Sequence, residues 1–129
     1  VEAVAKGVNK LSKGRTIKTK VAGVTFANPD GTDRQEIIRR YCRPGGELML
    51  RQEPGNEHDE QAISVWVRLP AATGVKAKWR QLGYINADLV DEVHALYEDG
   101  DPVSARILHV TEGGASRTLG VSIEIYKGS

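Results

Sequence analysis

The sequence predicts a mainly β domain with a minor helical part, arranged as a small six-stranded antiparallel β-barrel with two short helices. The first observation is size, because 129 residues, 40% of them hydrophobic, fit a single domain with one buried core. The second is that several segments alternate apolar and polar residues with period two, which is typical of strands. The third is that the links between neighbouring strands are too short for a crossover helix, so we expect antiparallel pairing. Barrel closure would remove the exposed edges of such a sheet.

The N-terminal part is predicted to be a flexible arm followed by a first strand. Residues 1–17 are rich in Lys, Gly, Asn and Ser and show no clear period, so we interpret them as the arm. The domain itself is expected to cover residues 18–127. Within it, the apolar residues of V-A-G-V-T-F at 21–26 predict the first strand.

A turn and a short helix are expected next. The run Asn28-Pro29-Asp30-Gly31 predicts a turn, since proline presets one turn angle and glycine accepts the positive one. Thr32 or Asp33 can cap the helix that follows, and the segment 44–46 (P-G-G) ends it.

The remaining chain is expected to supply five strands and a second helix. The helix is predicted over residues 86–97, capped by Asn86, with an apolar stripe opposite an acidic face. Residues 70–80 are expected to form a loop. The strands are predicted over residues 47–53, 61–68, 81–85, 103–110 and 119–126.

No residue constellation for catalysis is found. The one cysteine, Cys42, has no neighbouring His or helix N-terminus that would lower its pKa, so we expect a buried apolar side chain. The histidines are not at metal-ligand spacing, and the acidic segment 53–60 lacks the residue order of a calcium loop. Phosphate-binding glycine motifs are absent. We therefore expect a protein that is not an enzyme and uses no metal or cofactor.

Charge is distributed unevenly along the chain. Residues 1–20 hold six Lys or Arg and one acid, whereas residues 21–129 hold 12 basic and 16 acidic residues. A basic arm on a mildly acidic body is compatible with phosphate binding, but charge alone favours an ordinary solvated leader. No apolar run approaches the roughly 20 residues of a membrane-spanning helix.

Asp59 lies directly before a predicted buried strand, in H-D-E-Q-A-I. A carboxylate at this place can accept hydrogen bonds from backbone N–H groups and so fix the turn. It can also accept a hydrogen bond from a ligand hydroxyl. The two roles are compatible, because a carboxylate has about four lone-pair sites.

Three blocks of the sequence, in order, resemble the HIRAN domain family. They are V-A-G-V-T-F at 21–26, L-R-Q-E-P-G-N-E-H-D-E-Q-A-I-S-V at 50–65 and L-G-Y-I-N-A-D-L-V at 82–90. The middle block is the most specific of the three. The resemblance extends over about residues 18–127 and implies an OB-like β-barrel with two helices.

The resemblance also implies a function and a site. HIRAN domains occur with Swi/Snf-type helicases and in bacterial proteins, and a well-understood member holds the 3′-hydroxyl end of single-stranded DNA. Matched to that member's motif, Asn56 and Asp59 keep their residue types, with Asp59 as acceptor for the 3′-hydroxyl. His58 keeps a flat ring, and Phe26 can stack on a base. Thr25 stands where that member has an arginine.

Because Thr25 carries no charge, other cations are expected to neutralise phosphate. Arg51, Lys76, Lys78, Arg80 and the arm are the candidates. Aromatic side chains beside cations are typical of single-strand binding. The candidate platforms are Phe26, Trp66, Trp79 and Tyr84, although packing in the core is an equal alternative for Trp66 and Tyr84.

The sequence therefore predicts a non-catalytic nucleic-acid-binding module that recognises single-stranded DNA or a DNA 3′ end in repair or replication-fork processing. The alternative is a protein-interaction module whose acidic 86–97 face meets a basic partner. We expect a monomer that binds no membrane and resides in the cytoplasm at the bacterial nucleoid, or in the nucleus of a eukaryote. The predicted binding residues are Thr25, Phe26, Arg51, Asn56, His58, Asp59, Lys78, Trp79 and Tyr84.

Overall fold

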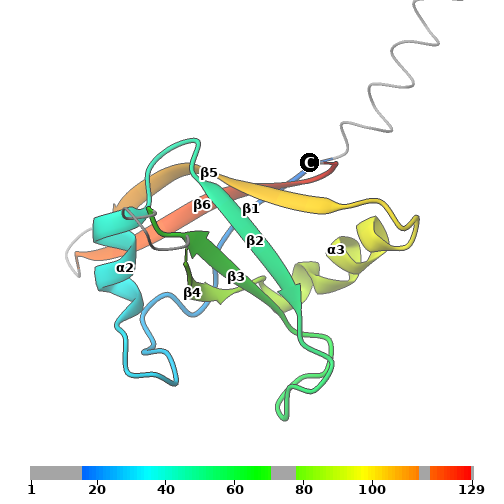
Figure 1. Cartoon of the computed structure of the whole chain (residues 1–129), viewed down its shortest axis with the longest axis horizontal. Coiled ribbons are helices and arrows are strands. Elements are labelled where there is room, and N and C mark those ends of the chain that lie inside the picture. Colours follow the sequence, from blue (N-terminus) through cyan, green and yellow to red (C-terminus); the bar gives the residue numbers. More distant parts are fainter. Residues whose placement is uncertain (1–15, 71–77, 114–116, 129) are drawn as a thin grey trace, which may run out of the picture.

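The computed structural model describes residues 16–70, 78–113 and 117–128. The greater part of the arm predicted over residues 1–17 lies outside these residues, as does Lys76. The described chain forms one six-stranded antiparallel sheet with two short helices, which confirms the predicted class (Figure 1). The strands are β1 (Thr16–Lys20), β2 (Glu47–Gln52), β3 (Ile63–Arg68), β4 (Trp79–Tyr84), β5 (Val103–Gly113) and β6 (Thr118–Lys127).

The strand order is β1-β6-β5-β2-β3-β4, so β1 and β4 are the two edges. The sheet curls without closing into a continuous ladder, contrary to the closed barrel that was expected. One bridge joins the two edges: the Ala22 N–H donates to the Tyr84 carbonyl over 2.8 Å, and the Tyr84 N–H donates to the Ala22 carbonyl over 2.9 Å. The result is a partly open, OB-like barrel.

The prediction of a first strand at residues 21–26 is wrong. The first strand is β1, where Ile17 is buried between exposed polar neighbours and the strand pairs with β6. After the bridge at Ala22 the chain turns, because Gly23 has a φ of +75° and the Phe26 N–H donates to the Gly23 carbonyl. Because β1 has a single buried side chain among lysines and threonines, its apolar pattern is too weak to predict a strand from the sequence.

The predicted turn and first helix are confirmed. The Gly31 N–H donates to the Asn28 carbonyl over 2.8 Å, which closes the turn. Asp33 then caps α2 (Arg34–Tyr41) by accepting from the Gln35 N–H over 2.9 Å. Figure 1 shows the chain before α2 and the chain between β2 and β3 extending to the same side of the sheet.

The second helical segment begins at the predicted cap residue, but it is divided into a 3₁₀ turn and an α-helix. Asn86 accepts from the Asp88 N–H, a 3₁₀ turn η1 (Ala87–Leu89) follows, and the α-helix α3 is limited to Val90–Tyr97. The strand predicted over residues 81–85 begins two residues earlier, so Trp79 and Arg80 belong to β4 and not to a loop.

The core lies inside the curled sheet and is covered by α2 and α3 at its two ends (Figure 1). Inward residues from several strands and both helices are fully buried, as the period-two and helical patterns predicted. They include Ile38, Ile63, Val65, Leu82, Val93, Leu96, Val121, Ile123 and Ile125.

Candidate nucleic-acid interface

Asn56 organises the loop between β2 and β3. Its Oδ1 accepts from the backbone N–H groups of His58 and Asp59, over 2.8 and 3.0 Å. Its Nδ2 donates to Glu53 Oε1 over 3.1 Å. The amide of Asn56 therefore serves the loop structure, and it fixes the place at which the two following side chains leave the backbone.

Asp59 has the turn-fixing role that the sequence predicted. Its Oδ1 accepts from the Gln61 N–H over 2.8 Å, and its carbonyl accepts from the Ala62 N–H over 3.0 Å. The side chain is exposed and lines a cavity at the same time. Since one carboxylate can accept several hydrogen bonds, the turn contact leaves acceptor capacity for a ligand.

Two adjoining cavities, which we call the His58–Tyr84 cleft, meet at this loop. The first, of about 330 Å³, is lined by Asn56, His58, Asp59 and Tyr84 together with the start of α3. The second, of about 640 Å³, is lined by Phe26, His58 and Tyr84 together with Arg34. Ala22, His58 and Tyr84 belong to both cavities. The structure thus brings together residues from three segments that are far apart in the sequence.

Phe26 is the large hydrophobic side chain left exposed among the described residues, at 67%. It projects from the turn that begins at Gly23 and forms one wall of the cleft. An exposed aromatic ring beside a cavity gains free energy when a flat ligand covers it. Thr25 is also exposed but lines neither cavity, so the structure does not bring it into the cleft.

Arg34 lines the cleft, although the sequence alone does not indicate it as a binding residue. It is 5% exposed, its Nε donates to Asn28 Oδ1 over 2.7 Å, and one of its terminal nitrogens donates to the Gly23 carbonyl over 2.8 Å. Burial lowers the pKa of Arg34, while Tyr84 and Glu53 raise it. The guanidinium group stays charged, because an arginine pKa begins above about 12. In the sequence, Arg34 follows the predicted cap residues Thr32 and Asp33, and no local pattern marks it as a cleft residue.

Tyr84 connects the cation to the loop. The Arg34 guanidinium lies 5.7 Å from the Tyr84 ring centroid, and the Tyr84 hydroxyl donates to Glu53 Oε1 over 3.4 Å. Glu53 Oε1 also accepts from Asn56. The aromatic ring, the cation and the loop carboxylate therefore hold each other in place before any ligand arrives.

Besides Thr25, three of the predicted binding residues lie outside the cleft. Trp79 lines a separate cavity of about 220 Å³ together with Trp66 and Arg80. Arg51 lies over the Trp66 ring, 5.8 Å from its centroid. Lys78 is exposed directly before Trp79. Apart from Thr25, the predicted set thus divides into a cleft at Tyr84 and a second group on the outer face of β2, β3 and β4.

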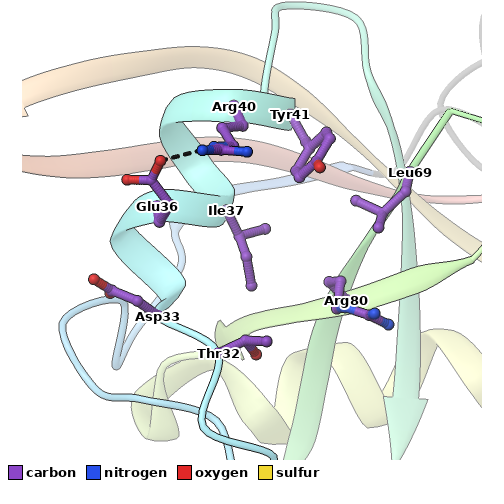
Figure 2. A pocket seen from close by; sticks show the side chains of 8 residues that line it. All are labelled: Thr32, Asp33, Glu36, Ile37, Arg40, Tyr41, Leu69 and Arg80. Carbon is purple, nitrogen blue, oxygen red and sulfur yellow. Dashed lines mark hydrogen bonds and ion pairs between the residues drawn. The ribbon is translucent and has the colours of Figure 1, made fainter.

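A further cavity, of about 280 Å³, lies between α2 and the strands (Figure 2). Helix α2 contributes Ile37, Arg40 and Tyr41 to it, and Arg80 projects from β4 on the opposite side. Arg40 donates to Glu36 over 2.8 Å, the ion pair drawn in Figure 2. Arg80 also lines the Trp66–Trp79 cavity, so it separates two hollows of the surface.

Two reactive arrangements, an activated thiol and a metal-binding cluster, are not seen among the described residues. Cys42 is buried, and desolvation raises the pKa of its thiol to about 12, which suppresses the reactive thiolate. No group of three or more His, Cys, Asp or Glu that could hold a metal ion occurs within residues 16–70, 78–113 and 117–128. In the same part of the chain, every helix is too short or too polar to cross a bilayer.

The small curled antiparallel sheet is of the OB-like kind and carries a cleft lined by aromatic and cationic side chains. The sequence matches the model of the HIRAN domain over residues 15–126, and the chain belongs to this family of nucleic-acid-binding modules.

Two solved structures share the fold. The HIRAN domain of human HLTF is 12% identical, with a TM-score of 0.53 over 87% of this chain and 74% of that chain. A protein from Lactobacillus plantarum is 19% identical, with a TM-score of 0.56 over 88% of this chain and 97% of that chain. A search of curated proteins found no match.

Proposed function

We propose that this domain binds the 3′-hydroxyl end of single-stranded DNA in the His58–Tyr84 cleft and catalyses no reaction. The observation that carries the proposal is that His58 and Tyr84 line both cavities of the cleft, with Phe26 in one and Asp59 in the other. Stacking surfaces and a hydroxyl acceptor therefore lie next to each other, as a terminal nucleotide requires.

The terminal base is expected to stack on Phe26, with the His58 ring at its other side. Each stacked base contributes about 1–3 kcal/mol in single-strand complexes. Asp59 accepts the hydrogen bond of the 3′-hydroxyl, and a terminal phosphate in its place would be repelled by the carboxylate.

Arg34 supplies the cation for the phosphate that precedes the terminal nucleotide. It lines the same cavity as Phe26 and forms no ion pair with a carboxylate within the described residues. Its hydrogen-bond acceptors, Asn28 and the Gly23 carbonyl, are neutral. The guanidinium keeps an attraction for an anion, because its hydrogen-bond partners are neutral and Glu53 acts on it without a direct ion pair.

Fluorescence anisotropy with labelled single-stranded DNA that ends in a 3′-hydroxyl or a 3′-phosphate tests the proposal. We expect tighter binding of the hydroxyl end and loss of this preference in Asp59→Asn, which keeps the oxygen that accepts from Gln61. Glu60→Gln is the matched control, because it removes the same charge at an exposed neighbour that lines neither cavity. Equal affinity of the wild-type domain for both ends would overturn end recognition.

The second candidate function, docking of a basic protein partner, is favoured by the exposed acids of the second helical segment. Asp88, Asp91, Glu92 and Glu98 are exposed, and none forms an ion pair with another described residue. We expect charge reversal at Asp91 and Glu92 to abolish binding of such a partner and to leave DNA affinity unreduced. Partner binding that survives the reversal would contradict this function.

A further inference from the structure

The two tryptophans of the chain line one cavity on the outer face of the sheet. Trp66 lies in β3 and Trp79 in β4, and both are half-buried. Pro29 and Gln81 complete the apolar and polar parts of the lining. Indole rings around a cavity of about 220 Å³ form a site for a flat ring.

Trp66 is held in position before a ligand binds. Its Nε1 donates to Ser64 Oγ over 2.8 Å, and the Arg51 guanidinium lies 5.8 Å from its ring centroid. The hydrogen bond satisfies the one donor of the indole. Because the Trp66 ring is already held, little conformational entropy is lost when a ligand binds to it. The Arg51 cation adds attraction for a nearby phosphate.

Asp30 and Arg80 are the charged residues that line this cavity. Asp30 accepts from the Thr32 N–H over 2.9 Å and from the Thr32 hydroxyl over 2.6 Å, which lowers the pKa of the Asp30 carboxyl. The ionised carboxylate can accept from the exocyclic amino group of a base. Arg80 can donate to a phosphate.

The tryptophan cavity is separate from the His58–Tyr84 cleft, but one hydrogen bond links the walls of the two. Asn28 lines the tryptophan cavity, and its Oδ1 accepts from Arg34, which lines the cleft. Arg80 then joins the tryptophan cavity to the hollow beside Arg40 (Figure 2). Arg34, Arg80 and Arg40 thus each line a different hollow, but Arg34 is buried and Arg40 is paired with Glu36. Arg80 is therefore the cation best placed for a phosphate of a strand that leaves the cleft.

We propose that the Trp66–Trp79 cavity binds a further base of the same DNA strand whose end occupies the cleft, with Arg80 contacting its phosphate. This subsite rests on the proposed function and extends it from end recognition to recognition of the strand. The domain then prefers a strand several nucleotides long over a terminal dinucleotide.

Intrinsic fluorescence reports directly on this subsite, because both tryptophans of the chain line it. The test compares a dinucleotide with a single strand of about ten nucleotides, within the roughly 4–16 nucleotides that one OB fold can cover. Both end in a 3′-hydroxyl. We expect the longer strand to quench tryptophan fluorescence and to bind roughly tenfold or more tightly than the dinucleotide.

Trp79→Ala is expected to remove this advantage of the longer strand, and Trp79→Phe to restore most of it. Arg80→Gln is a second variant that keeps both indoles. Circular dichroism verifies the fold of each variant. Equal affinities for the two ligands without quenching would overturn the subsite, while Asp59-dependent dinucleotide binding would leave end recognition intact. Quenching without a 3′-end preference would overturn end recognition and support the subsite alone.

Discussion

Arg34 shows at the scale of one residue how the domain carries positive charge in its cleft. The side chain is buried to 5% exposure, and two neutral oxygens hold its guanidinium against Tyr84. An arginine in this environment is geometrically fixed by two hydrogen bonds, so its charge can attract a phosphate without further ordering of the side chain. Arg34 can supply the positive charge that the uncharged Thr25 does not.

Arg34→Gln is expected to reduce the salt dependence of DNA binding. The slope of the logarithm of the association constant against the logarithm of salt concentration should fall by about 0.7, the value for one phosphate contact with a single strand. Anisotropy titrations at several salt concentrations measure it.

Arg39→Gln is the control for this change, because Arg39 is exposed on the same helix, pairs with Glu36 and lines none of the cleft. Arg34→Lys should restore the slope in part, since it keeps the charge but not the fork. An unchanged slope in Arg34→Gln would show that Arg34 contacts no phosphate.

Strand β4 shows at the scale of an element why a glycine is needed beside the cleft. A Cβ atom at Gly83 would lie 2.1 Å from the Ala22 carbonyl oxygen and 2.9 Å from a Val21 methyl carbon. The bare Cα lets the chain after β1 approach β4 closely enough for the Ala22–Tyr84 bridge. This bridge places Ala22 and Tyr84 on the wall that both cavities share.

Gly83→Ala is expected to open the bridge and to destabilise the domain by at least the roughly 1–3 kcal/mol typical of overpacking. Urea unfolding measures the loss, and faster hydrogen exchange at the Ala22 and Tyr84 amides localises it. Gly55→Ala is the control, because a Cβ there meets no atom within 4 Å. Equal stability of the two variants would contradict the steric argument.

The stability of the whole molecule is expected to decline in alkali. Burial raises the pKa of Cys42 to about 12, from an ordinary value near 9.0, and also raises the pKa of Tyr97. Both groups lose protons more readily in the unfolded chain. Their contribution to the free energy of unfolding is fully present below pH 9 and is lost as the pH rises toward 12.

For the thiol alone, the free energy of unfolding should fall by up to about 1.4 kcal/mol per pH unit above pH 9. Denaturant unfolding of the wild type and of Cys42→Ala, at pH 7 and at several values above 9, measures this contribution. The variant should lose less stability than the wild type over that range. Parallel losses in the two proteins would show that Cys42 does not titrate on unfolding.

The sequence by itself determined the fold class, most strands and the places where both helical segments begin. It also indicated that the central loop carries residues suited to binding. These features depend on local patterns: period-two alternation in β3, the cap at Asp33, and the turn signal at 28–31. Such patterns act over a few residues, so they can be recognised without the rest of the chain. Where the local pattern was weak, as in β1, the prediction was wrong.

Only the tertiary structure decided which of the predicted residues lie together. Phe26, His58 and Tyr84 meet because the edges of the curled sheet are bridged at Ala22, whereas Trp79 lies with Trp66 in another cavity. Arg34 became a cleft residue for the same reason. Such proximity arises from pairing between distant segments, and the periodicity of a single segment carries no information about it.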